Sequence, residues 1–159
     1  MKKISYPVVA FALIIASCTH ADKKHEHGHG MENEPKTLID SLEKDIDEGH
    51  IVGMSKIGKL HNTKKEVQLV IDSISALPAK AKEALTPYLE QLQSAIKDID
   101  YADFAMDKWM TENEHDSPKN DTEKRTAYLR DERDKVSKMK DAILNSISKA
   151  DSLLKVKMK

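Results

Sequence analysis

Residues that interrupt helices are scarce in this sequence. The 159 residues include only five Gly and five Pro, which leaves long stretches without the residues that break or bend a helix. The alternation of apolar and polar residues that marks a half-buried strand is also missing. Together these absences predict an all-α fold.

Aromatic residues and an excess of charge of one sign are equally scarce. Phe, Trp and Tyr make up 4% of the chain, so the core must be built from aliphatic side chains and methionine. The 26 Lys and Arg residues nearly cancel the 27 Asp and Glu residues. Because no basic field covers the chain as a whole, we expect no nucleic-acid partner.

Cysteine occurs once, at Cys18, which excludes a disulfide within the chain. Before it come the basic Lys2 and Lys3 and an apolar run over 8–16, shorter than the roughly 20 residues needed to span a bilayer. The four residues that end at Cys18 are aliphatic, small, small and cysteine, and resemble the lipobox of bacterial lipoproteins. That resemblance implies a signal peptide over 1–17 and acylation, such as palmitoylation, of Cys18. The alternative is an ordinary secretory signal that contains a cysteine.

Acylation would determine where the protein resides. Each buried CH₂ group of an acyl chain contributes about 0.8 kcal/mol, so two or three chains anchor a protein stably to a membrane. The expected location is the bacterial cell envelope. Thr19 is not an acid, which disfavours retention in the inner membrane and favours the outer membrane, facing the periplasm or the cell surface.

The segment 18–34 lacks an apolar period and is expected to be a disordered tether that follows the lipidated cysteine. Its histidines alternate with other residues, and neutral imidazoles on a flexible chain can bind Zn²⁺, Ni²⁺ or Cu²⁺. The residues are His20, His25, His27 and His29. The alternative is a polar spacer whose histidines bind metal without a purpose.

Residues 35–159 show three apolar stripes with a helical period close to 3.5 residues. The first stripe contains Ile39, Leu42, Ile46, Gly53, Ile57, Leu60, Val67, Ile71 and Ile74. The second contains Leu85, Tyr88, Leu92, Ala95, Ile99, Ala102, Met106 and Trp109, and the third Leu129, Val136, Met139, Ile143, Ile147, Ala150 and Leu154. We expect an antiparallel three-helix bundle of long helices with coiled-coil-like packing.

The ends of these helices are marked by Pro and polar residues. The first helix should end near Pro78, with an interruption near Thr63 as an alternative, and the second should begin either after Pro78 or at Pro87. Asn120, with an acid three residues later, is the expected N-cap of the third helix.

One end of this bundle gathers side chains that can bind a metal. Folding the chain back near Pro78 brings His50 and Met54 level with Asp107 and Asp103, with Met106 and Met110 about one turn away. The candidate ligands are His50, Met54, Asp103, Met106 and Met110. Thioethers with an imidazole suit Cu(I). His50 with Asp103 and Glu132 would instead suit Zn²⁺ or iron, and haem between His50 and a methionine is a weaker option.

The same residues also have a purely structural interpretation. Methionines at helical spacing commonly fill a core, and Asp103 paired with Arg125 would set the register of the helices. Gly49 and Gly53 are expected to permit close helix packing, whereas Gly58 points away from the bundle.

Two segments resemble a family of small bacterial lipoproteins often labelled "viral A-type inclusion protein". The first reads His50-x-x-x-Met54-x-Lys56-Ile57-Gly58-x-Leu60, and the second Ala102-Asp103-x-Ala105-Met106-x-x-Trp109-Met110. The segment 136–153 is similar as well, whereas Phe104 and Lys108 depart from the pattern. The resemblance implies a helical, lipid-anchored protein and no particular activity.

Signatures of common enzyme classes are missing from the chain. It contains no Gly-x-Ser-x-Gly, no phosphate-binding Gly-x-x-x-x-Gly-Lys-Ser/Thr, no His-Glu-x-x-His and no Gly-x-Gly-x-x-Gly. We therefore expect a non-catalytic, lipid-anchored envelope protein that binds or spaces a partner, either another envelope protein or a second copy of itself. The alternative function is binding of copper, zinc or another metal.

Overall fold

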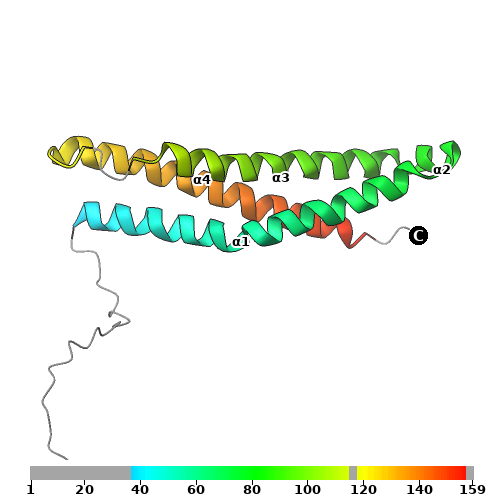
Figure 1. Ribbon diagram of the computed structural model, residues 1–159, viewed down its shortest axis with the longest axis horizontal. Helices are drawn as coiled ribbons and strands as arrows, with labels where there is room; N and C mark the ends of the chain where they lie inside the picture. Colours follow the sequence, from blue (N-terminus) through cyan, green and yellow to red (C-terminus); the bar gives the residue numbers. More distant parts are fainter. Residues whose placement is uncertain (1–36, 115–117, 157–159) are drawn as a thin grey trace, which may run out of the picture. The chain divides into compact units, whose positions relative to one another are not determined.

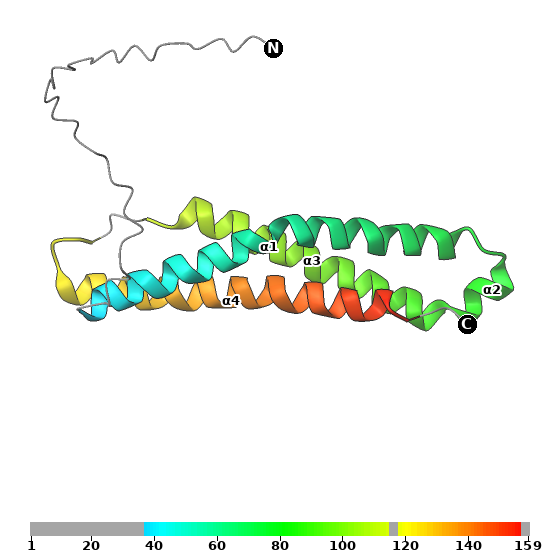
Figure 2. The same ribbon diagram turned by 90° about the horizontal axis from the view of Figure 1, so that it is seen from below.

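The computed structural model describes residues 37–114 and 118–156, and these residues form helices and no strands. The helices are α1 (Leu38–Ser75), α2 (Ala79–Ala84), α3 (Thr86–Glu112) and α4 (Thr122–Leu154). Helices α1 and α4 run in the same direction and pack against each other, and α3 runs in the opposite direction and packs against both (Figures 1 and 2). The prediction of an all-helical fold with packed helices is confirmed.

Polar side chains determine where α1 and α4 begin. The Thr37 hydroxyl accepts the N–H of Asp40 at 3.1 Å, and the Asp40 carboxylate accepts the N–H of Thr37 at 3.0 Å, a reciprocal capping box. At α4 the cap is Asp121, whose carboxylate accepts the N–H of Lys124 at 3.1 Å. The predicted cap at Asn120 is therefore wrong by one residue, because the acid next to it is an equally good acceptor and directly precedes the first helical residue.

The connection between α1 and α3 uses both prolines that the sequence offers. The six residues of α2 begin directly after Pro78, and Leu85 then interrupts the helix with φ −100° and ψ 2°. Helix α3 starts at Thr86 with Pro87 in its first turn, where the missing N–H of proline has no helical partner to lose. The described residues thus contain four helices, where the sequence analysis expected three.

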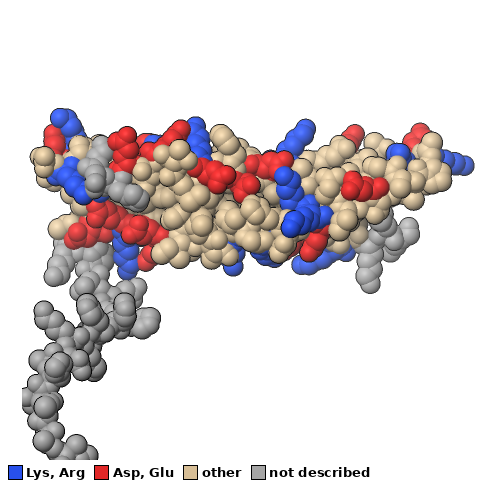
Figure 3. All heavy atoms as spheres, viewed as in Figure 1, with Lys and Arg blue, Asp and Glu red and all other residues tan. Residues whose placement is uncertain are grey.

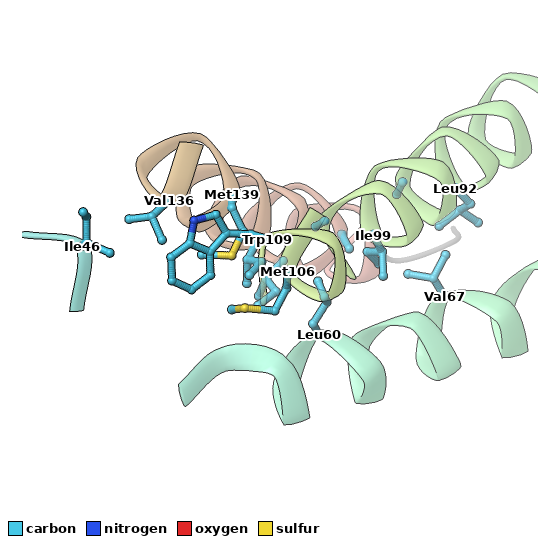
Figure 4. Packing of buried hydrophobic residues seen from close by; sticks show 14 of the residues in the cluster. Ile46, Leu60, Val67, Leu92, Ile99, Met106, Trp109, Val136 and Met139 are labelled. Carbon is cyan, nitrogen blue, oxygen red and sulfur yellow. The ribbon is translucent and has the colours of Figure 1, made fainter. Parts of the chain in front are cut away.

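The predicted apolar stripes form one continuous core. Figure 4 shows side chains from α1, α3 and α4 meeting along it. Its buried hydrophobic members are Leu42, Ile46, Leu60, Val67, Ile74, Leu92, Ala95, Ile99, Ala102, Met106, Trp109, Leu129, Val136, Met139, Ile143, Ile147 and Ala150. Helix α1 is not interrupted near Thr63, and that residue is buried within the core face with 3% exposure.

The surface of the bundle is charged, and both signs are interspersed on the face shown in Figure 3. Pairs in which both side chains are partly exposed connect neighbouring helices: Lys59–Asp151, Lys64–Asp100, Lys149–Asp98 and His61–Asp103. Within the described residues, none of the helices combines the length and the apolarity that crossing a bilayer requires.

Candidate functional site

Trp109 lies where α1, α3 and α4 meet. It is the single tryptophan of the chain and is 7% exposed. Its indole N–H donates a hydrogen bond of 2.9 Å to the Glu132 carboxylate of α4. A buried indole N–H needs such an acceptor, and this requirement explains why an acid occupies the apolar stripe of α4.

The Glu132 carboxylate is also paired with a cation. Lys135 donates to it at 2.8 Å and to the exposed Asp131 at 2.7 Å. These hydrogen bonds, the one to Asp131 first and then the one to Glu132, raise the pKa of Lys135 above its ordinary value. The buried carboxylate is therefore satisfied on both oxygens, by an indole on one side and an ammonium group on the other.

His50 approaches the same tryptophan from α1. The centroids of the two rings are 5.0 Å apart and their planes are inclined by 45°. The Nε2 atom of His50 is buried and has no hydrogen-bond partner among the described residues. Most buried polar atoms have a hydrogen-bond partner. Among the nitrogen and oxygen atoms of the predicted metal ligands, His50 Nε2 is therefore the buried atom that lacks one in the described residues.

Met106 packs into the space left by Gly53, which lies about one helical turn beyond His50 on α1. A Cβ atom built at Gly53 would lie 2.7 Å from Met106 Cε and 3.4 Å from Met139 Cε. A Cβ atom at Gly49 would lie 2.6 Å from Val136 Cγ1, whereas one at Gly58 would meet nothing within 4 Å. The prediction of close packing at the first two glycines, with the third pointing outward, is confirmed. Figure 4 shows Met106 and Trp109 close to Met139 of α4.

The other predicted ligands are arranged differently. Met54 and Met110 are each 44% exposed, in contrast to Met106 at 1%. The Asp103 carboxylate accepts a hydrogen bond of 2.8 Å from His61. The structure therefore brings His50 and Met106 to the tryptophan and directs Asp103 to a histidine further along α1.

His61 was not predicted as the partner of Asp103. The expected register placed Asp103 level with Met54, and His61 lies about two helical turns further along α1. The Lys64–Asp100 pair follows the same diagonal between α1 and α3, and its only trace in the sequence is the spacing of three residues that separates Lys64 from His61 and Asp100 from Asp103. Exposed ionic pairs of this kind stabilise weakly and are difficult to infer before the register is known.

Arg125 pairs with an acid as expected, but with a different one. Its guanidinium donates to the Glu43 carboxylate at 2.7 Å, and it lies 5.8 Å above the centre of the Tyr128 ring. The Tyr128 hydroxyl accepts the Glu114 N–H at 2.8 Å and donates to the Asn113 side chain at 3.1 Å. Burial is the main cause that raises the pKa of Tyr128. These contacts connect the start of α4 to α1 and to the end of α3.

Carboxylates and imidazoles do not gather into a metal site here. In the ranges 37–114 and 118–156, no group of three or more His, Cys, Asp or Glu side chains is placed to hold a metal ion. The two carboxylates of the zinc or iron alternative, Asp103 and Glu132, are bonded to His61 and to Trp109 with Lys135. A copper site based on thioethers remains a prediction, with His50 Nε2 and Met106 as its inward-facing ligands.

The remaining predicted site residues lie outside the described residues. They are the acylated Cys18 and the tail histidines His20, His25, His27 and His29.

Comparison of the chain with protein families, with curated proteins and with solved structures finds no match.

Proposed function

We propose that this protein is a non-catalytic lipoprotein of the bacterial cell envelope whose helical bundle binds a partner or spaces it from the membrane. The observation that carries the proposal is the lipobox-like sequence at Cys18, placed ahead of a helical bundle. The outer membrane is the proposed membrane, because Thr19 gives no acidic retention signal.

The length between the anchor and the bundle limits how far the bundle can lie from the membrane. Residues 19–36 separate Cys18 from the cap of α1. An extended chain spans at most about 3.5 Å per residue, so the start of α1 can lie no more than roughly 60 Å from the lipid. The proposed role is therefore a binding module held close to a membrane surface.

The surface of the bundle supports binding more than catalysis. The space between α3 and α4 is a groove of about 280 Å³ with apolar side chains, lysines and glutamates along it. Its residues include the exposed Tyr101 and Phe104, which contribute contact area and no acid–base pair. Exposed aromatic side chains are enriched at protein interfaces.

Metabolic labelling with an alkyne analogue of palmitate tests the proposed anchor. The full chain should incorporate the label and sediment with membranes, and Cys18→Ser should lose the label and appear in the soluble fraction after secretion. Thr19→Ser is the matched control, because it changes a neighbouring residue and leaves the acylated sulfur in place. An unlabelled wild-type protein in a host that labels other lipoproteins would overturn the proposal.

The second candidate function is binding of Cu(I), and the observation that favours it is the unpartnered, buried Nε2 atom of His50. A soft cation could take this nitrogen together with the thioether of Met106. A bound Cu(I) ion would give His50 Nε2 the bonding partner that it lacks among the described residues.

Anaerobic Cu(I) titration of mature protein lacking residues 19–34 tests this candidate. One equivalent should bind and quench the fluorescence of Trp109, whose ring is 5.0 Å from His50. His50→Ala should abolish binding, whereas Met54→Ala, at a largely exposed position, should leave it nearly unchanged. A protein that stays empty throughout the titration rules the candidate out.

A further inference from the structure

Two of the five aromatic side chains in the described residues are exposed next to each other on α3. Tyr101 is 63% exposed and Phe104 is 60% exposed, although the chain as a whole is poor in aromatics. The other three, Tyr88, Trp109 and Tyr128, are buried or partly buried and hydrogen-bonded. Exposed aromatic pairs of this kind are common at the centres of protein interfaces.

These two residues belong to a stripe on the outer side of α3, which we call the α3 stripe. Its members are Lys97, Tyr101, Phe104, Ala105, Lys108 and Glu112. Each lies three or four residues from the next, except for the adjacent pair Phe104 and Ala105, which together stand between Tyr101 and Lys108. Residues with this spacing lie on one face of a helix. The last five also line the groove between α3 and α4, which has Lys138 and Met139 on its opposite wall.

The α3 stripe is complementary in charge and size to a second copy of itself that runs in the opposite direction. A basic residue, Lys97, stands at one end and an acidic residue, Glu112, at the other. Inside them, Tyr101 and Lys108 occupy mirrored positions, and at the centre the large Phe104 is followed by the small Ala105. A second α3 stripe laid antiparallel would therefore present a partner for each of these residues.

We propose that the α3 stripe is the contact surface of a symmetric dimer of this chain, with a two-fold axis that passes between Phe104 and Ala105. Phe104 of each copy packs against Ala105 of the other copy. The Lys108 ammonium lies over the Tyr101 ring of the other copy, a favourable cation–π arrangement. Lys97 forms an ion pair with Glu112 of the other copy. A two-fold axis makes every contact occur twice, which is the usual arrangement of protein dimers.

The charges needed at the ends of the stripe are available for this contact. Among the described residues, Lys97 has no ion-pair partner. Glu112 has only Lys108, one helical turn away, at 3.9 Å, and its side chain is 63% exposed. A parallel arrangement of two stripes would place Lys97 against Lys97 and Glu112 against Glu112, which is repulsive. Charge complementarity therefore selects the antiparallel arrangement.

The inference rests on the proposed function in one respect, which is that the bundle is the binding part, and it names a second copy as the partner. The lipid anchor has no part in the contact. A Cys18→Ser chain should therefore lose the palmitate label and still dimerise, so that failure of the anchor and failure of the dimer are separate results.

Sedimentation velocity of the full chain, in a detergent matched to the solvent density, tests the dimer. The wild type should sediment as a dimer, and Lys97→Glu and Glu112→Lys should each raise the dissociation constant about tenfold or more, because like charges then meet twice. Carrying both changes in one chain, or mixing the two single variants in equal amounts, should restore dimerisation, since either case returns opposite charges to each contact.

Two further variants locate the contact. Phe104→Asp should yield a monomer, and Lys65→Glu, a matched charge reversal at an exposed position of α1, should leave the dimer intact. Circular dichroism should show unchanged helicity for all of these variants, because each substituted residue is exposed. A wild type that stays monomeric up to about 100 μM overturns the proposal. A dimer that Phe104→Asp leaves intact, or one that the mixture of single variants does not restore, also overturns it.

Discussion

Glu132 is 3% exposed, and its carboxylate bonds to two groups of opposite character, a neutral indole and an ammonium. Glu132 stands three residues after Leu129 and Asp103 three residues before Met106, so the helical period places both acids on core-facing stripes. Periodicity alone could not separate them, because a residue near the edge of a stripe can turn its carboxylate to solvent. Asp103 does so and meets His61 there, whereas Glu132 stays inside because the indole N–H requires an acceptor.

Removing the buried acceptor should destabilise the fold. Glu132→Ala leaves the Trp109 N–H without a partner and frees Lys135 from its buried contact, and we expect a loss of about 2–3 kcal/mol in the free energy of unfolding. Glu132→Gln keeps an acceptor for the indole N–H, so its free energy of unfolding should fall by less than that of Glu132→Ala. Urea denaturation followed by circular dichroism measures both. Asp131→Asn is the exposed control, expected within about 0.5 kcal/mol of the wild type. A loss for Glu132→Ala no larger than that of the control would contradict this description.

The raised pKa of Lys135 predicts a dependence of stability on alkaline pH. A lysine whose folded-state pKa lies above the unfolded value of about 10.4 contributes stability that is fully present below that value. The contribution is lost as the pH rises through the folded-state pKa. Lys135→Arg keeps its charge over this range, so its stability relative to the wild type should increase above about pH 10.5. Urea midpoints at several pH values measure the difference, and parallel curves for the two proteins would contradict the prediction.

Helix α1 carries three glycines that differ in what lies opposite them. Val136 is β-branched and stiff where it faces Gly49, whereas the flexible end of Met106 faces Gly53 and open space faces Gly58. The sequence analysis correctly separated the inward glycines from the outward one, since helical periodicity depends only on spacing. It could not rank the two inward positions, because that requires the identity of the facing side chain.

Substituting alanine at each glycine should therefore give three different results. Gly58→Ala should raise the free energy of unfolding by about 0.8–1 kcal/mol, the ordinary gain in helix propensity. Gly49→Ala should lower it by about 1–3 kcal/mol, because the new methyl group overlaps a stiff side chain. The free energy of unfolding of Gly53→Ala should lie between those of the other two variants, because the flexible side chain of Met106 can move away from the new methyl group. Thermal and urea denaturation provide the order, and a stabilised Gly49→Ala variant would contradict the packing.

The ends of the elements were less predictable than their faces. Thr63 continues α1 because tertiary burial outweighs the modest helix propensity of threonine. The short α2 could not be inferred, because its six residues show no apolar period and contribute no buried side chain. Where two polar residues stand together before a helix, as Asn120 and Asp121 do, cap preferences alone do not choose between them.

For the bundle as a whole, the ionic contacts between helices lie mainly on the surface, apart from that of the buried Arg125 with Glu43, and the apolar contacts lie inside. The pairs Lys59–Asp151, Lys64–Asp100 and Lys149–Asp98 have side chains between 33% and 52% exposed. Periodicity predicted the interior well, because each apolar stripe has only one face to bury. The ionic contacts, and with them the position of Asp103, depend on the register between helices, which follows from three-dimensional packing and not from spacing along one helix.

Salt should therefore affect the stability of the protein only slightly. Raising NaCl from about 0.05 M to about 1 M shortens the Debye length to roughly 3 Å and screens exposed pairs, which contribute at most about 1 kcal/mol each. We expect the free energy of unfolding at neutral pH to change by less than about 2 kcal/mol. Urea denaturation at both NaCl concentrations measures the change in the free energy of unfolding. A loss of more than about 4 kcal/mol would mean that the charged surface, and not the core, holds the helices together.

The position of Trp109 also provides the molecule with an intrinsic spectroscopic reporter. Its indole touches the imidazole of one helix and the carboxylate of another, so its emission depends on all three long helices being assembled. Emission intensity and wavelength should therefore follow assembly and ligand binding at this junction in unlabelled protein.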